Sequence, residues 1–591
     1  MRCIIIVALL AAIAMLLARK QAFLNQTSSS SPEEAYLKNF STSTVLPEES
    51  HFRLLDKLAE LAQYHRHAYY ANQQVLELHR ADQRFQQAID LLEGIAQKAA
   101  TPLIRERLQK THSSLFEAAV ANAYELYQLT DSLHYIDVAW FYTEKSKTVF
   151  QKYALPKKVT GKKVKATFCR PQAIKKITST TLDADQTLVQ YFFAGTYLYV
   201  FAFSENNADL WRFSYDEKLE EAVKKVRESI AAWAQSRTDL QLLAYTQNAH
   251  WLYEQLLAPI ASRLNKRLII IPDGCLEHLP FDALLYDSVN IDQQSFKDYP
   301  YLIQRHAISY ASSLTLLRDL RRHKKRAAIP QILAFAPSYT ENEQNGAGAS
   351  GSNIRGSQTA LLNNTNEIQL IASLMPSQTL IGASATKERF LKEMDQYQII
   401  HLAMHAQFDE QNAEMSHLHF THVAEHPAQN LLYAKELYDM ELNADLVVLS
   451  ACETGMGEMK KGEGLVSLKN GFMYAGAKSQ IATLWQVSDL ETAQIMQLFY
   501  KGLVRKESKD AAMQLAKLDY LKSTEPALAH PFYWAAFTAS GDVTALDFSS
   551  ETRPLWWTLL IFGLVAQILY IIARILGFIK HKETRFKGAI G

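Results

Sequence analysis

A histidine and a cysteine each stand at the end of an apolar run in the C-terminal half of this chain. The run QIIHLAMH ends on His405 and the run ADLVVLSAC ends on Cys452, after which the segment Glu-Thr-Gly (453–455) interrupts the apolar pattern. A thiolate attacks a carbonyl best when a nearby imidazole takes its proton and later protonates the leaving amine. The two residues are therefore a candidate nucleophile and base. The alternative is an inert core cysteine, which is the commoner case after an apolar strand.

Short β-rich runs alternate with helical segments from about position 165 onward. This alternation predicts an α/β fold with a largely parallel sheet, and the apolar runs LIII and LVVL are typical of strands covered on both faces. Functional groups gather at the carboxyl ends of strands in such sheets. The separation of 47 positions between His405 and Cys452 leaves room for one strand and one helix between adjacent strands. The predicted strands are two within 187–203, then 266–272, 332–337, 398–405, 444–452 and 479–485.

The segment before this domain, residues 51–160, predicts an antiparallel array of helices. It has few helix breakers and carries Leu, Ala, Tyr and Phe at intervals of three to four residues. Segments 68–92 and 119–144 resemble one another, and each is interpreted as two helices joined by a short polar turn. They are similar to degenerate tetratricopeptide units. Because two units are fewer than a free-standing solenoid needs, a plain helical bundle is the alternative.

Several motifs follow one another along residues 165–545. They include LIIIPDGCLEHLPFDALL (268–285), ASATKERFLKEMDQYQIIHLAMHA (383–406), VVLSACETGMGE (447–458), LWQVSD (484–489) and HPFYWAAFTASGD (530–542). In this combination and order the chain resembles the CHAT peptidases, which are relatives of caspases, separases and gingipains. The resemblance implies a caspase-like α/β domain and a cysteine-type endopeptidase that uses no metal and no cofactor.

The resemblance also implies roles for individual residues. The base falls on His405 and the nucleophile on Cys452, whereas His401 points into the strand and is structural. The oxyanion would be held by the backbone N–H groups of Cys452 and Ala406. The family usually has Gly where this chain has Ala406, and an alanine would be strained if the site required a positive φ. This departure favours a weak or inactive peptidase.

Asp489, in the motif LWQVSD, has two readings. It matches the acid that in separases lies in the pocket for the residue preceding the cut, which implies cleavage after a basic residue. The alternative is an N-cap for a helix that begins near Leu490, because aspartate before an apolar periodic run is a good cap. Glu463 is expected to be structural or part of a pocket wall rather than a third catalytic member.

Other kinds of functional site have weaker support in the sequence than the His405–Cys452 pair. Four histidines within MSHLHFTHVAEHPAQN suggest a zinc site, but histidines on a strand usually satisfy a hydrogen bond, and the resemblance implies an ordinary strand there. The segment PDG (272–274) lacks the glycines and lysine of a phosphate loop. The cysteines are few, scattered and never spaced as CxxC, so neither a disulfide framework nor a zinc ribbon is supported. The histidines are His417, His419, His422 and His426, and the cysteines are Cys3, Cys169, Cys275 and Cys452.

Both ends of the chain carry membrane signals. Residues 1–20 are interpreted as a signal peptide or signal anchor, and a buried N-terminal helix is the alternative. The run Leu555–Ala573 is apolar with Gln567 as its one strongly polar residue, and it predicts a transmembrane helix within 555–579. The basic tail, 580–591, indicates a cytoplasmic C-terminus, which places the main domain outside the cytoplasm, in the periplasm. The pair Arg19-Lys20 argues the other way. Residues 21–50 are expected to be a linker.

The overall charge gives no sign of a nucleic-acid partner. The chain has 62 Lys and Arg against 61 Asp and Glu, so no global field attracts nucleic acid. The expected partners are a protein or peptide substrate, the membrane, and a regulatory protein bound through the helical segment. The low-complexity segment 341–358 is a candidate cleavage site. The alternative function is a membrane-tethered, non-catalytic scaffold, which an oxidising compartment hostile to a free thiol would also favour.

Overall fold

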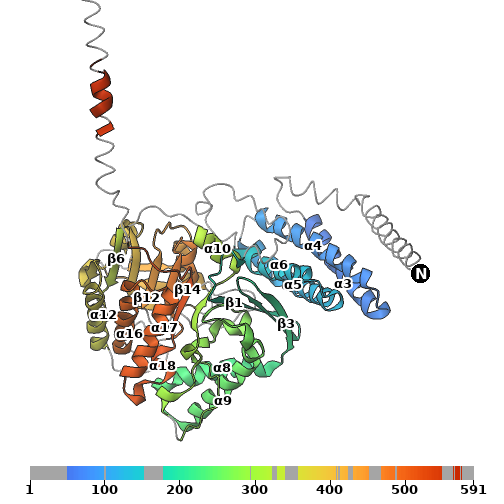
Figure 1. Cartoon of the computed structure of the whole chain (residues 1–591), viewed down its shortest axis with the longest axis horizontal. Coiled ribbons are helices and arrows are strands. Elements are labelled where there is room, and N and C mark those ends of the chain that lie inside the picture. Colours follow the sequence, from blue (N-terminus) through green and yellow to red (C-terminus); the bar gives the residue numbers. More distant parts are fainter. Residues whose placement is uncertain are drawn as a thin grey trace, which may run out of the picture.

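The computed structural model places an array of long helices beside a large α/β domain (Figure 1). The predicted helical segment followed by an α/β domain is confirmed. The structure describes residues 49–98, 102–151, 178–292, 295–322, 329–339, 357–407, 409, 413–422, 430–450, 468–485, 487, 489–548, 563–564, 566–572 and 574.

Four helices form the array, in two antiparallel hairpins that close in the same way. The residue after the first helix of each hairpin, Gln73 or Asp131, has a positive φ of 57° or 51°. Its N–H donates to the carbonyl four residues earlier, at 2.7 Å for Gln73 and 2.8 Å for Asp131, which is a left-handed helix cap. Both turns lie inside the two segments that resemble one another. The helices are α3 (Glu49–Asn72), α4 (Val75–Lys98), α5 (Pro102–Thr130) and α6 (His134–Gln151).

The central sheet consists of two halves that run in opposite directions, each parallel within itself except for β2, which is antiparallel to β1 and β3. Its strand order is β3-β2-β1-β4-β5-β14-β13-β12-β8-β6-β7, and the antiparallel pair β13–β14 joins the halves. The carboxyl ends of β8 and β12 therefore lie at the edge opposite those of β4 and β5. The strands are β1 (Gln186–Ala194), β2 (Tyr197–Phe203), β3 (Ala208–Ser214), β4 (Arg267–Ile271), β5 (Ala307–Tyr310), β6 (Ile329–Ala336), β7 (Ser377–Ile381), β8 (Tyr397–Ala403), β12 (Leu446–Ser450), β13 (Ser479–Thr483) and β14 (Phe537–Gly541).

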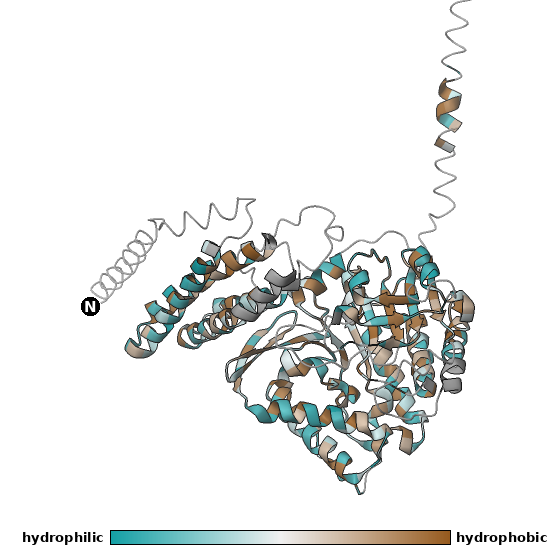
Figure 2. Ribbon diagram, turned by 180° about the vertical axis from the view of Figure 1, so that it is seen from behind, coloured by the Kyte–Doolittle hydropathy of each residue, from teal (hydrophilic) through white to brown (hydrophobic). Residues whose placement is uncertain are grey.

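Helices cover both faces of the sheet, which explains the continuous apolar runs of its strands. In β4, for example, Leu268 and Ile270 face one apolar cluster, and Ile269 and Ile271 face another. Apolar residues accordingly concentrate in the strands in Figure 2. One face packs on α8 (Glu217–Ala231), α9 (Asp239–Leu256), α12 (Ser357–Ala372), α16 (Asp489–Val504) and α17 (Lys509–Ser523). The other packs on α3 to α6 and on α13 (Lys387–Glu393), α14 (Ala434–Leu437) and α15 (Leu468–Tyr474).

Buried polar contacts fasten α6 to the α/β domain. The Glu144 carboxylate accepts hydrogen bonds from the N–H groups of Leu314 at 3.3 Å and Thr315 at 2.9 Å, at the start of α10 (Leu314–Arg322). It also accepts one from the Gln190 side chain at 3.1 Å. A carboxylate at a helix N-terminus satisfies donors that the helix itself leaves unpaired. The array is therefore part of the body of the protein, with which it shares one apolar cluster.

The PDG segment is part of the same attachment. Lys147 on α6 donates to the carbonyl of Pro272 at 2.6 Å, and the Asp273 carboxylate accepts from the N–H of Phe193 at 2.8 Å. Gly274 has a φ of +52°, and a Cβ there would meet the Phe193 ring at 3.2 Å. The turn thus has a structural role at the end of β4.

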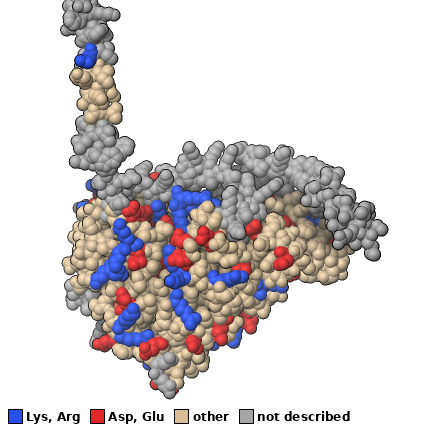
Figure 3. All heavy atoms as spheres, viewed as in Figure 1, with Lys and Arg blue, Asp and Glu red and all other residues tan. Residues whose placement is uncertain are grey.

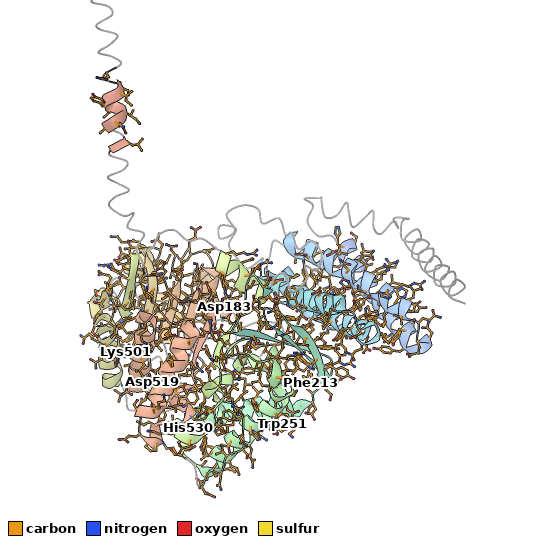
Figure 4. All side chains as sticks on the ribbon, viewed as in Figure 1. Asp183, Phe213, Trp251, Lys501, Asp519 and His530 are labelled. Atoms are coloured by element: carbon orange, nitrogen blue, oxygen red, sulfur yellow. The ribbon has the colours of Figure 1, made fainter. Side chains whose placement is uncertain are left out.

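Two other motifs of the sequence also pack against each other. The Trp485 indole N–H of LWQVSD donates to the carbonyl of Phe532 in HPFYWAAF at 2.9 Å. His530, labelled in Figure 4, accepts from the Phe532 N–H at 3.1 Å and caps α18 (Pro531–Trp534). Its ring stacks on Trp233 at 4.1 Å, and burial lowers its pKa well below the ordinary value. His530 is thus a neutral structural cap.

Charged side chains of both signs are interspersed on the face seen in Figure 3. In the part of the chain that the structure describes, no helix is both long and apolar enough to cross a membrane. The predicted span, 555–579, falls mostly outside that part, as do the predicted signal, 1–20, and the linker, 21–50, except for its helical last two residues.

Candidate active site

His405 and Cys452 follow neighbouring parallel strands at the same distance from a matched pair of residues. In the register of β8 and β12, Ala403 lies opposite Ser450, and the two candidate residues come two positions after them. The segments that follow β8 and β12 therefore leave the sheet at the same edge and at matched positions in the strand register. Cys452 itself lies outside the described residues, so the position of its thiol is not part of this geometry.

The connection between the two strands differs from the single strand and helix that we expected. It contains a small antiparallel sheet of β9 (Ala406–Gln407), β10 (His417–His419) and β11 (Leu431–Tyr433), followed by α14. This sheet begins directly after His405. It holds the backbone of the candidate base in place immediately beyond the end of β8.

The His405 side chain is half-buried against an aromatic ring. The Tyr339 ring lies 4.5 Å from the imidazole between centroids, at an interplanar angle of 42°. Burial lowers the pKa of His405 below its ordinary value of 6.5, because a charged imidazolium loses more hydration than a neutral ring. At neutral pH the imidazole is therefore uncharged and able to accept a proton.

Ala406 lies in an extended strand, not in a left-handed turn. It pairs with Leu418 of β10, and it is not among the described non-glycine residues with positive φ. The neighbouring N–H of His419 donates to the carbonyl of His405 at 2.9 Å, so Ala406 and Leu418 form a non-hydrogen-bonded pair. The Ala406 N–H consequently points away from β10. The strain that would have counted against this alanine is absent.

His401 is fully buried within a chain of polar side chains. Its Nδ1 lies 3.0 Å from the Tyr500 hydroxyl and its Nε2 lies 3.0 Å from Glu367. The other oxygen of Glu367 accepts from the Ser450 hydroxyl at 3.0 Å. The geometry agrees with the structural role expected for His401. It also links α12 and α16 to the last residue of β12, two positions before Cys452, and nothing in the sequence pattern around Glu367 signals this link.

The remaining predicted site residues are placed only in part. Asp489 is the first residue of α16, and the structure does not describe its side chain, so pocket and cap both stay open. Glu463 lies outside the described residues.

The histidine cluster is packed by aromatic and backbone contacts. The rings of His417 and His419 lie 4.8 Å apart, and His417 Nδ1 lies 2.8 Å from the carbonyl of Met415. The Tyr433 ring lies 5.1 Å from that of His417. Within the described residues, no three or more His, Cys, Asp or Glu side chains are grouped to hold a metal ion. His426 lies outside them.

Cys275 provides an internal reference for thiol reactivity. It is 4% exposed, and burial, with help from Glu220 and Asp273, raises the pKa of its thiol to about 12. Because the thiolate is the reactive form, this cysteine is inert near neutral pH. Cys3 and Cys169 lie outside the described residues.

Comparison with known families decides the classification. The model of the CHAT domain matches residues 246–542, half of the chain. The chain belongs to the CHAT domain family. Its CHAT domain contains β4 to β14, and therefore both strands that lead to His405 and Cys452.

Curated relatives of this chain include tetratricopeptide repeat protein 28 from Mus musculus and from Homo sapiens. The mouse protein is 24% identical over 346 residues and the human protein 23% over 354 residues. Each match covers 51% of this chain and 13% of the relative. The chain thus spans only a small part of the length of these relatives.

Solved structures similar to this chain include a cysteine proteinase and a separase–securin complex. One is the Arg-specific cysteine proteinase gingipain R, with a TM-score of 0.30, 11% identity, and coverage of 56% of this chain and 75% of that one. The other is Saccharomyces cerevisiae separase in complex with securin, with a TM-score of 0.40, 10% identity, and coverage of 83% of this chain and 40% of that one.

Proposed function

We propose that this protein is a cysteine endopeptidase in which Cys452 is the nucleophile and His405 the general base and acid. The observation that carries the proposal is the common register of the two residues beyond Ala403 and Ser450 on adjacent strands. The membership in the CHAT family agrees with it.

The chemistry follows from the groups at this edge. His405 takes the proton of the Cys452 thiol while the sulfur bonds to the peptide carbonyl carbon, and the oxyanion accepts hydrogen bonds from the N–H groups of Ala406 and Cys452. The imidazolium then gives its proton to the leaving amine as the C–N bond breaks. Water, deprotonated by His405, hydrolyses the thioester and restores the thiol. The lowered pKa of His405 keeps it in the basic form that the first step needs.

Labelling of the two cysteines by iodoacetamide tests the proposal. At neutral pH, Cys452 should be alkylated faster than Cys275, as measured by peptide mass spectrometry, and His405→Ala should slow Cys452 by about a hundredfold or more while leaving Cys275 unchanged. Equal rates at the two cysteines, with no effect of His405→Ala, would overturn the proposal. That result would favour a non-catalytic scaffold that acts through protein contacts.

For specificity, we propose that Asp489 selects a basic residue before the cut. Asp489→Ser and Asp489→Ala separate this role from helix capping, because serine caps a helix as well as aspartate but carries no charge. A pocket residue predicts that both variants lose the preference for Arg or Lys peptides over uncharged ones. A cap alone predicts that the serine variant cleaves like the native chain and that only the alanine variant is less stable.

We also propose that the C-terminal run anchors the protein in a membrane, with the body in the periplasm and the tail in the cytoplasm. The apolar segment Leu555–Ala573 and the basic residues after it support this. Large apolar side chains between residues 564 and 572 are 47–62% exposed. The full chain should stay in the membrane pellet after alkaline extraction, whereas a chain ending at Pro554 and lacking residues 1–20 should be soluble. Release of the full chain would argue against an anchor.

The helical array is the proposed site for a regulatory partner. It attaches through Glu144 and Lys147 near the carboxyl ends of β4 and β5, which is the sheet edge opposite His405. A partner bound there would not compete directly with substrate. A pull-down with the array surface altered, compared with the native chain, tests whether binding depends on it.

A further inference from the structure

Tyr339 stands beside the candidate base but belongs to another strand segment. It follows β6 by three residues and is 8% exposed. The chain at this point is held firmly, since the N–H of Ser338 donates to the Thr421 hydroxyl at 3.1 Å. That hydroxyl in turn donates to the carbonyl of Gly382 at 2.7 Å. The tyrosine therefore projects from a fixed backbone.

The Tyr339 hydroxyl sits inside the hydrogen-bond ladder that follows β8. His405 and His419 face one another across β9 and β10, and a regular pair would exchange two backbone hydrogen bonds. One of them is present, from the His419 N–H to the His405 carbonyl at 2.9 Å. In place of the other, the His405 N–H donates to the Tyr339 hydroxyl at 2.9 Å, and the hydroxyl donates to the His419 carbonyl at 2.9 Å.

The same side chain contacts the imidazole. Its ring lies at 4.5 Å from that of His405 between centroids, close enough to restrict rotation of the imidazole and to keep water from that side. One residue thus fixes the backbone of His405 through its hydroxyl and the ring of His405 through its own ring. The His405 N–H that Tyr339 binds is one peptide unit before the N–H of Ala406, which is the proposed oxyanion donor.

We propose that Tyr339 is a positioning residue of the active site, which sets the backbone of His405 and the plane of its imidazole and, through them, the direction of the Ala406 N–H. This inference rests on the proposed peptidase function. It goes beyond it by assigning a role to the segment after β6. By binding the His405 N–H, the hydroxyl also leaves Ala406 as the donor that can turn toward the substrate.

Two substitutions separate the two contacts. Tyr339→Phe removes the hydroxyl and keeps the ring, and Tyr339→Leu removes both. The matched control is Tyr191→Phe, because Tyr191 is buried in the other half of the sheet and its hydroxyl donates to the carbonyl of Leu256 at 3.1 Å. Each phenylalanine variant loses a buried hydroxyl, so a general loss of stability would affect both.

The first measurement is the rate of alkylation of Cys452, with Cys275 as reference. Tyr339→Phe should slow Cys452 by about tenfold, as a small misplacement of a catalytic group does, while Tyr191→Phe keeps the native rate. For a cleaved peptide, the loss should appear in kcat with KM unchanged. A native rate in Tyr339→Phe, or an equal loss in Tyr191→Phe, would overturn the inference.

The second measurement does not need activity. Histidine NMR titration, with the His405 signal assigned by its absence in His405→Gln, should show a pKa that moves up toward the ordinary value in Tyr339→Leu and not in Tyr191→Phe. An unchanged His405 titration would refute the positioning role even in a protein whose Cys452 is unreactive. Failure of His405→Ala to slow Cys452 refutes the peptidase proposal instead, so the two failures are distinct.

Discussion

At each of the two opposite edges of the sheet a buried strand leads to a cysteine, but the described residues nearby differ. At one edge β4 leads through Pro-Asp-Gly to Cys275, and at the other β12 leads through Ser-Ala to Cys452. The first edge carries the turn against which α6 packs, and burial, together with acidic neighbours, raises the pKa of Cys275 to about 12. The second edge lies at the end of β12. The neighbouring strand β8 leads to His405, whose half-buried imidazole is neutral.

Both cysteines follow the end of a buried strand, so this position alone assigns a catalytic role to neither. The two strands are equally apolar and equally buried, so position in the sheet does not separate them. The neighbouring groups differ, because burial and acidic residues suppress the thiolate of Cys275, whereas in the proposed function the neutral imidazole of His405 promotes that of Cys452. Four experiments test how far this difference reaches.

The largest effect is expected from the cysteines themselves. Cys452→Ala should reduce cleavage of peptides with a basic residue before the cut to background, because the proposed thioester forms on the Cys452 sulfur. Cys275→Ala should cleave at the native rate. Both are measured as kcat/KM on one fluorogenic peptide, and substantial cleavage by Cys452→Ala would remove the distinction between the two edges.

The second effect is a difference in the pH range over which each cysteine becomes reactive. Since burial lowers the pKa of His405, its basic form persists to a pH below 6.5, and alkylation of Cys452 should rise with a midpoint below that value. Alkylation of Cys275 should rise only toward a pKa of about 12. Rates between pH 5 and 10 give both profiles. A midpoint at or above pH 6.5 for the alkylation of Cys452 would show that burial does not lower the pKa of His405.

The third effect is on stability alone. Glu144→Ala leaves the N–H groups of Leu314 and Thr315 without their carboxylate, which should lower the free energy of unfolding by about 2–3 kcal/mol. Glu228→Ala, on the exposed face of α8, should change it by less than about 0.5 kcal/mol. Chemical denaturation gives both values. Alkylation of Cys452 should stay at the native rate in both variants. A slower rate in Glu144→Ala would mean that the attachment of α6 at one sheet edge affects the reactivity of Cys452 at the other.

The smallest effect separates backbone strain from steric crowding at the sheet edge that carries Cys275. Gly195 and Gly274 have φ of +60° and +52°, but a Cβ at Gly195 meets nothing within 4 Å, whereas one at Gly274 meets the Phe193 ring at 3.2 Å. Gly195→Ala should cost about 1 kcal/mol of stability from strain, and Gly274→Ala should cost more. Thermal unfolding of the pair measures the difference. Equal losses would mean that Phe193 moves aside at no cost.

Much of the fold could be predicted because buried strands and long helices leave strong local patterns. The apolar runs of β4, β8 and β12 and the polar turns at Gln73 and Asp131 signal their structure directly. β5 has four residues, and β14 lies within the motif HPFYWAAFTASGD, so neither stands out as a strand. The reversal between the halves depends on the pairing of β13 with β14, a contact that local patterns do not encode.

The candidate site could be predicted where it follows from strand ends and from family resemblance, as for His405. It could not be predicted where distant segments meet. Tyr339 and His405 are 66 positions apart, and Ser450 and Glu367 are 83, so tertiary packing alone creates these contacts. At Ala406 the sequence suggested a backbone strain that the structure does not have. The expectation of strain assumed a turn, whereas the pairing with Leu418 gives an extended backbone that any residue adopts.

The cluster that joins the helices to the sheet limits how this chain can be shortened. Tyr199, Phe201, Ile269 and Ile271 are at most 1% exposed under cover of the array. A fragment beginning at residue 165 would present these side chains to water, and each buried side chain of this size is worth roughly 1.5–3 kcal/mol. A bare sheet face of this kind invites aggregation. Recombinant versions meant for the assays above should therefore begin before Glu49.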